Sequence, residues 1–227
     1  MAPAGAFEHC RRLVAEFDKE RYWASLYAPA DKRDALYALY AFDREIARVP
    51  AVAREPIAAE IRLQWWREVL ERKRDGEAAA NPVAAALLGV VARHDVPAGR
   101  LIALIDVRGG RLYDEQIDDL EAFADAVYGA IIVLAAQVLG GQGEAVDHIA
   151  HHAGAARAYA EANDPTQARG HLDAARTLLS KIPQQALPAL LPAAVIGPSF
   201  GRDTSLPLWR RQWIIWRAAR NPQRIFG

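Results

Sequence analysis

Three histidines near residue 150 have the residue type and the spacing of a candidate metal site. His148 and His152 are four residues apart on a predicted helix, so their imidazoles share one helix face, and His151 lies beside them. Zinc normally needs three or four protein ligands. No cysteine is near, and the adjacent carboxylate is Asp147. The sequence therefore favours a structural or surface role for these histidines over a zinc site.

Acidic side chains are the second group that could bind a cation. A run of them leads into a predicted helix: Asp114, Glu115, Asp118, Asp119 and Glu121. This pattern is typical of a loop followed by the first turn of a helix, where the helix dipole favours carboxylates. We prefer that interpretation to a metal site, because runs of charge are usually solvated.

Asp43 and Glu45 are the acidic residues in the middle of another predicted helix. We expect them to form ion pairs with nearby cations, and a Mg²⁺ site at these two carboxylates is the alternative. The expected partners are Arg44, Arg48, Lys32 and Arg33.

Trp209, Trp213 and Trp216 have a spacing that places them on one face of a C-terminal helix with arginines around them. The favoured interpretation is a face that packs on the core, with Trp213 inside and one edge of Trp209 or Trp216 outside. The alternative is a face that docks on a membrane surface or a partner protein, because tryptophan and arginine together suit an interface.

The elements that must position these residues are predicted to be helices. Alanine is frequent, alternating strand-like segments are hard to find, and prolines mark the expected breaks between helices. We expect helices near 5–27, 31–49, 56–75, 82–94, 97–110, 118–140, 144–162, 166–182, 184–197 and 207–220. Recurrence at helical spacing predicts an inward-facing set: Tyr37, Tyr40, Phe42, Leu63, Trp66, Leu87, Leu104, Ile131, Leu134 and Val138.

Composition limits the class of protein. A chain of 227 residues can bury one substantial core, so we expect a single all-α domain over 1–227. The 28 basic residues balance the 28 acidic ones, which gives no reason to expect nucleic acid binding. The lone Cys10 fits a reducing compartment. No apolar run reaches the ~20 residues of a spanning helix, and the first residues do not read as a signal peptide.

Several segments in order carry a family resemblance: RYWASLYAPADKRDALYALYAF (21–42), EIRLQWWREVLE (60–71), NPVAAALL (81–88) and SLPLWRRQWIIWRAAR (205–220). They resemble the squalene/phytoene synthase family, and the last segment resembles a bacterial subgroup related to mitochondrial complex I assembly factor 6, a non-catalytic relative. The resemblance implies an isoprenoid-synthase-like helical bundle. In the catalytic members, paired aspartates hold Mg²⁺ ions that bind a prenyl diphosphate.

The catalytic aspartate positions of that family are altered in this chain. The resemblance places Ala47 and Ala51 at the two aspartates of the first motif, and Arg111 at a further acidic position. The second motif should follow the segment 148–160, but the chain continues as EANDPTQARGHLDAA (161–175). The resemblance therefore implies a bundle that is shortened in its middle and has lost its metal ligands.

Three functions remain open at this point. The first is a non-catalytic assembly or partner-binding factor with room for a prenyl or lipid ligand, and the resemblance makes complex I biogenesis the process. The second is an active prenyltransferase that condenses prenyl diphosphates, for which alone Mg²⁺ is expected as a cofactor. The third is a remnant without a specific role. Candidate residues for a cavity or a partner contact are Tyr37, Tyr40, Phe42, Asp43, Arg44, Trp65 and Trp66.

The first function has consequences for partners and location. We expect a protein partner, a prenyl or lipid ligand as a secondary feature, and peripheral contact with a membrane through the tryptophan face. The expected location is cytoplasmic. If the tryptophan face contacts a membrane, the expected position is peripheral, at the inner membrane surface.

Overall fold

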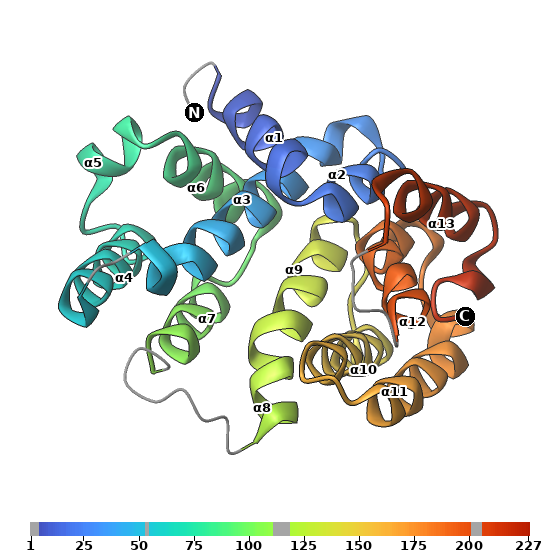
Figure 1. The fold of residues 1–227 in the computed structure, drawn as a ribbon. Coiled ribbons are helices and arrows are strands. Elements are labelled where there is room, and N and C mark those ends of the chain that lie inside the picture. The colour runs from blue at the N-terminus through green and yellow to red at the C-terminus, as the bar shows by residue number, and fades with distance from the viewer. Residues whose placement is uncertain (1–4, 53–54, 111–118, 201–205) are drawn as a thin grey trace. The chain divides into compact units, whose positions relative to one another are not determined.

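The structure of the chain is a computed structural model that describes residues 5–52, 55–110, 119–200 and 206–227 (Figure 1). The described residues form helices and contain no strand, which confirms the all-α prediction. The chain folds as two compact units, residues 1–17 with 34–118 and residues 18–33 with 119–227. The predicted single domain over 1–227 stays a prediction.

The first unit is built from six helices among the described residues. They are α1 (Ala6–Phe17), most of α3 (Ala30–Val52), α4 (Pro56–Leu70), α5 (Asp75–Ala80), α6 (Pro82–His94) and α7 (Ala98–Gly110). Helix α1 packs on α6, and α4 packs on α7. Asn81 caps α6, because its side-chain oxygen accepts hydrogen bonds from the backbone N–H groups of Val83 and Ala84 at 3.0 Å, and Pro82 takes the first helical position.

The second unit centres on a helical hairpin. Helix α10 (Glu144–Glu161) packs on α11 (Pro165–Leu178) and on the continuous helix formed by α8 (Leu120–Ala124), a π-helical turn η1 (Asp125–Gly129) and α9 (Ala130–Val138) (Figure 1). Asp164 caps α11, accepting from the N–H groups of Thr166 and Gln167 at 3.1 Å. The remaining elements are α2 (Lys19–Ser25), the 3₁₀ turns η2 (Leu179–Lys181), η3 (Gln184–Ala189), η4 (Leu191–Val195) and η5 (Pro222–Arg224), α12 (Ile196–Ser199) and α13 (Leu208–Arg220).

Helix α10 and the π-turn approach each other at two glycines. A Cβ atom on Gly154 would lie 2.8 Å from the backbone nitrogen of Gly129 and 3.0 Å from the carbonyl oxygen of Ala124. No side chain fits in that space. The close crossing of the two helices therefore requires glycine at position 154, whereas a Cβ atom on Gly129 would lie 3.4 Å from the carbonyl oxygen of Ala150 and could be accommodated by a small shift.

Several predicted helices differ from the structure. The helix predicted over 56–75 ends at Leu70, and the short helix α5 that follows it was not predicted. The helix predicted over 5–27 is broken at Asp18, whose side chain caps α2 by accepting from the N–H of Arg21 at 3.1 Å. The helix predicted over 184–197 is a series of 3₁₀ turns, because Pro188 and Pro192 lack the N–H groups that an α-helix would use there. The residues predicted to face inward are all buried, so that prediction is confirmed.

One helix of the described part passes a length and composition test for crossing a membrane. The stretch Leu120–Val138 has a mean hydropathy of 1.5 over its most apolar window, of which 44% is buried inside the protein. The prediction that no stretch reaches this length was wrong by that test. The same stretch packs against α10 within the second unit, as the core helix of a soluble protein also would.

Candidate functional site

Helix α3 carries the positions at which the family resemblance placed metal-binding aspartates. Asp43 and Ala47 are four residues apart, so they lie on one helix face, and Ala51 follows four residues later in the sequence. Ala47 is exposed and offers only a methyl group. Asp43 is buried, and its Oδ1 accepts a hydrogen bond from Nη2 of Arg108 on α7 at 2.7 Å. The carboxylate of this face is therefore held in an ion pair between two helices.

The predicted ion pair of α3 is confirmed for Glu45, and Asp43 has a partner that the sequence did not indicate. Glu45 pairs with Arg48 at 3.3 Å, as expected. Asp43 pairs with Arg108, which is 65 residues away in sequence and could not be found by looking along one helix. Arg44 lies over the ring of Phe17 on α1, with its guanidinium carbon 4.2 Å from the ring centre.

These residues do not fit Mg²⁺ and a prenyl diphosphate. Mg²⁺ prefers oxygen ligands that are free to coordinate it, and two alanines with an arginine-bound aspartate do not supply them. Arg111 and the acidic residues 114, 115 and 118 lie outside the described residues. Asp119 is described and caps α8, with its carboxylate accepting from the N–H of Ala122 at 2.9 Å, as the solvated-turn interpretation predicts.

The aromatic candidates of the first unit form part of its core. Tyr37, Tyr40, Phe42 and Trp66 are buried, and the rings of Phe42 and Trp66 meet edge to face with their centres 5.3 Å apart. Trp65 is half-buried and stacks edge to face on Trp66 at 5.0 Å. Its indole N–H donates to Oε2 of Glu77 at 2.8 Å.

An open groove of about 780 Å³ runs along α4 and α7. Trp65 lines it, whereas the four buried aromatic candidates do not. Four charged residues of its wall form two ion pairs, Arg74 with Glu68 at 2.7 Å and Arg67 with Asp106, and Arg74 also holds Glu77, which is not a wall residue, at 2.8 Å. The hydrogen bonds from Arg74 and Trp65 lower the pKa of Glu77. A groove in which four of the wall charges cancel in pairs offers little excess charge to attract a ligand.

The C-terminal helix α13 presents its tryptophans to solvent. Trp209, Trp213 and Trp216 are 70%, 49% and 41% exposed, and Leu208 beside them is 52% exposed. The guanidinium carbons of Arg217 and Arg220 lie 4.4 and 4.3 Å from the ring centres of Trp213 and Trp216. The prediction that Trp213 lies inside is wrong. We refer to Leu208, Trp209, Trp213 and Trp216 as the tryptophan face.

The side of α13 that packs on its own unit consists of two apolar residues smaller than tryptophan and one arginine. Ile215 and Ala218 are fully buried, and Arg211, which shares their face, forms an ion pair with Glu20 of α2. The Glu20 side chain is only 14% exposed. Because a buried carboxylate needs a partner, Arg211 is held inward, and the tryptophans on the opposite side of the helix face outward.

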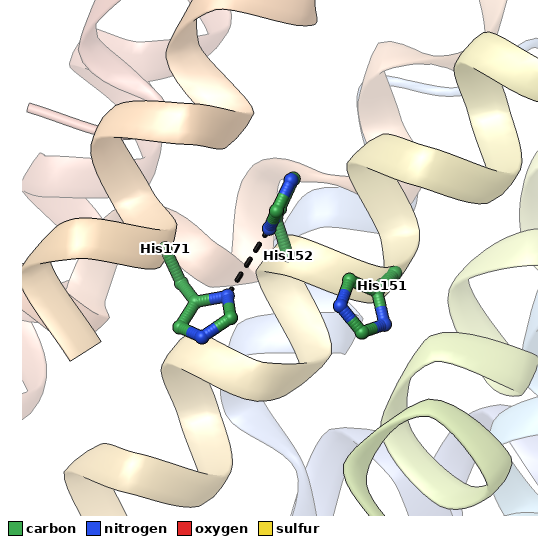
Figure 2. A group of neighbouring side chains, drawn as sticks. All are labelled: His151, His152 and His171. Carbon is green, nitrogen blue, oxygen red and sulfur yellow. Dashed lines mark hydrogen bonds between the residues drawn. The ribbon is translucent and has the colours of Figure 1, made fainter. Parts of the chain in front are cut away.

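The histidines of α10 meet a third histidine that the sequence did not single out. His151, His152 and His171 offer ligand atoms that all lie within 4.8 Å of one another, and Figure 2 shows these rings coming from α10 and α11. Burial and the neighbouring histidines lower the pKa of His152. His148 is exposed and is not part of this group. The pairing predicted by spacing, His148 with His152, is therefore not the one that the fold makes.

His171 was missed because it lies on the next helix. A helical hairpin brings α11 back along α10, so residues about twenty positions apart become neighbours. The signal for that turn was present in the sequence as Asp164 followed by Pro165, which cap and begin α11.

With this geometry in view, comparison with known proteins identifies the class. The squalene/phytoene synthase family matches residues 14–161, and the chain belongs to that family. A crystal structure of a dehydrosqualene synthase in complex with ligand superposes with a TM-score of 0.79 over 97% of each chain at 13% identity. At that identity the superposition shows the shared fold.

The similar curated proteins are named NADH dehydrogenase (ubiquinone) complex I, assembly factor 6. The human protein is 31% identical over 156 residues, 67% of this chain and 47% of the relative. The bovine protein is 29% identical over 160 residues, 69% of this chain and 48% of the relative. The chain spans about half the length of the curated relatives it matches.

Proposed function

We propose that this chain is a non-catalytic member of the squalene/phytoene synthase family that acts in the assembly of respiratory complex I by binding a partner protein. The observation that carries the proposal is the tryptophan face, an apolar and cationic surface that the protein leaves open to solvent. The names of the curated relatives support the process.

Loss of the first aspartate pair supports the non-catalytic part of the proposal. Departure of diphosphate from a prenyl substrate needs its charge neutralised, which Mg²⁺ would do in this family. On α3, alanine stands at the exposed position 47, and the buried Asp43 is bound by Arg108. We therefore expect no Mg²⁺-dependent release of diphosphate from farnesyl or geranylgeranyl diphosphate above a boiled control.

The composition of the tryptophan face supports a docking role. Tryptophan and arginine are the residues that most often dominate binding energy at protein interfaces. Arg217 and Arg220 lie on the rings of Trp213 and Trp216, so cation and ring form one mixed surface. Such a surface suits a partner that combines apolar side chains with carboxylates. An anionic membrane has related chemistry, and a position at the inner membrane surface would follow from binding there.

The proposal is tested in cells that lack the chain. Re-expression of the wild-type protein should restore assembled complex I on a native gel. A variant with Trp209, Trp213 and Trp216 changed to Ala should restore little, although it accumulates to a normal level. The matched control is Ile57→Ala with Ile61→Ala, because these side chains are also exposed, at 60% and 67%, and lie on α4 of the other unit.

Two results would contradict the proposal. Full rescue by the triple variant would remove the tryptophan face from the function, and unchanged complex I in cells without the chain would remove the assembly role. Co-sedimentation with anionic liposomes at low and high salt identifies the occupant of the face. Binding to vesicles that is lost in the triple variant would favour a membrane over a protein partner.

A further inference from the structure

The second unit contains a group of imidazoles that neither the family relationship nor the assembly role uses. His151 and His152 lie on α10 and His171 lies on α11, and their ligand atoms fall within 4.8 Å of one another. The Nδ1 atoms of His152 and His171 are 3.1 Å apart (Figure 2). Two ligands of a tetrahedral zinc ion with Zn–N bonds of about 2.0–2.1 Å lie about 3.3 Å apart. One edge of the group already has that spacing.

Two carboxylates lie beside the imidazoles. Glu121 of α8 has Oε1 3.5 Å from Nε2 of His171 and Oε2 3.8 Å from Nε2 of His151. Asp125, the first residue of the π-turn, has Oδ1 3.3 Å from Nδ1 of His151. Three helices and the π-turn therefore bring three imidazoles together, with two carboxylates against them. Glu121 lies beside Nε2 of His171, not the Nδ1 atom that faces His152, so it must rotate to reach an ion bound there.

The surroundings orient this group. Tyr159 stacks on His171 with ring centres 5.5 Å apart and planes 21° apart, and its hydroxyl donates to Oε1 of Glu121 at 3.3 Å. His171 is held among these groups with its side chain 12% exposed, whereas His151 and Glu121 are 34% and 46% exposed. Hydrogen bonds of this kind from a second layer of residues fix metal ligands in their productive orientation. The more exposed His151 and Glu121 have room to rotate.

We propose that His151, His152 and His171 form a binding site for a divalent transition-metal ion of the zinc class, with Glu121 as the fourth ligand. Imidazole with one carboxylate suits Zn²⁺, Ni²⁺, Co²⁺ or Cu²⁺ and is a poor set for Mg²⁺. The imidazole ligand atoms lie within 4.8 Å of one another, so their separations must close by at most about 1.5 Å to reach the roughly 3.3 Å spacing of a tetrahedral site. Rotation of His151 and Glu121 about their side-chain bonds supplies that movement.

The site would link α8, α10 and α11 within the second unit. A ligand that binds the folded protein and not the unfolded chain raises the apparent stability. The inference therefore concerns a structural ion that joins the hairpin to the helix with the π-turn. It goes beyond the assembly role and does not depend on it.

The experiment uses the full chain without an affinity tag, treated with a chelator and then dialysed. Calorimetric titration with Zn²⁺ should give one equivalent of tight binding, and Zn²⁺ should raise the Tm. In His171→Ala and in His152→Ala, the Kd should rise at least about tenfold. Glu121→Gln should give a smaller rise, because water can replace a carboxylate ligand. The matched control is His148→Ala, which removes an exposed histidine of the same helix outside the group.

Circular dichroism establishes that each variant is folded. The wild-type protein loaded with Co²⁺ gives a second measurement that needs no variant, since its visible absorption reports a four- or five-coordinate site with nitrogen ligands. An octahedral Co²⁺ spectrum, or an equal loss of Zn²⁺ affinity in His148→Ala and His171→Ala, would overturn the proposal in favour of adventitious surface binding. Absence of stoichiometric binding of Zn²⁺, Ni²⁺ and Co²⁺ would overturn it outright.

Discussion

Helices α3 and α13 both carry aromatic residues at helical spacing, and they place them in opposite environments. On α3, Tyr37, Tyr40 and Phe42 are buried, whereas on α13 the three tryptophans are 41–70% exposed. The difference lies in the other residues of each helix. The alanines and leucines next to the aromatic residues of α3 are buried too, so this stretch of the helix has no polar side to turn toward the core instead. On α13 the buried side is made by Ile215, Ala218 and the arginine that pairs with the buried Glu20, so the tryptophans are left outside. Aromatic periodicity thus identifies a face without saying whether that face lies inside.

The largest expected effect is a loss of stability when a buried aromatic residue of α3 is removed. Phe42→Ala removes a fully buried ring and its edge-to-face contact with Trp66. The free energy of unfolding should fall by about 3–5 kcal/mol, the usual cost of a large cavity in a core. Urea denaturation followed by circular dichroism measures it. A loss below about 1 kcal/mol would mean that this part of α3 is not packed as described.

A second substitution tests whether the ion pair between Arg211 and Glu20 sets the orientation of α13. Arg211→Ala leaves the carboxylate of Glu20 largely buried without its partner. We expect a loss of about 1–3 kcal/mol, because an unpaired buried charge is costly. Arg210→Ala on the exposed side should stay within about 0.5 kcal/mol. Equal effects of the two substitutions would show that the ion pair does not orient the helix.

The exposed tryptophan should behave unlike the buried phenylalanine. Trp213→Ala removes a ring that is 49% exposed, so the free energy of unfolding should change by about 1 kcal/mol or less. Binding to a partner or to anionic liposomes should fall in the same variant. A stability loss as large as that of Phe42→Ala would place Trp213 in a core, which was the prediction from the sequence.

The smallest expected effect concerns Cys10, whose thiol should not react with an alkylating reagent in the folded wild-type protein. Cys10 is fully buried on α1, and burial raises the pKa of its thiol to about 12. Because the thiolate is the nucleophile, alkylation by iodoacetamide at neutral pH should be negligible until the first unit opens. Phe42→Ala should accelerate the labelling, and Trp213→Ala should not. Mass spectrometry after timed quenching gives both rates, and rapid labelling of the folded wild-type chain would contradict the burial of α1.

The sequence predicted the helical class and the inward-facing residues, because these follow from periodicity within one segment. Leu63 and Leu104 are examples: each was placed inward by its spacing, and each is buried. The break at Asp18 was missed because a capping aspartate looks like any polar residue in a helical run. The partners of Asp43 and His152 were missed for a different reason. Arg108 and His171 lie on other helices, and spacing along one helix carries no information about them.

The π-turn η1 sets the rotational phase between α8 and α9. A π-turn holds one more residue than an α-turn, so it rotates everything before it relative to everything after it by about 100°. With the turn in place, Asp125 faces His151 while Gly129 meets Gly154. Deletion of one residue within 125–129 would leave a continuous α-helix of good local geometry whose acidic residues no longer face the histidines. The composition of this helix would be almost unchanged, and its phase alone would separate the carboxylates from the imidazoles.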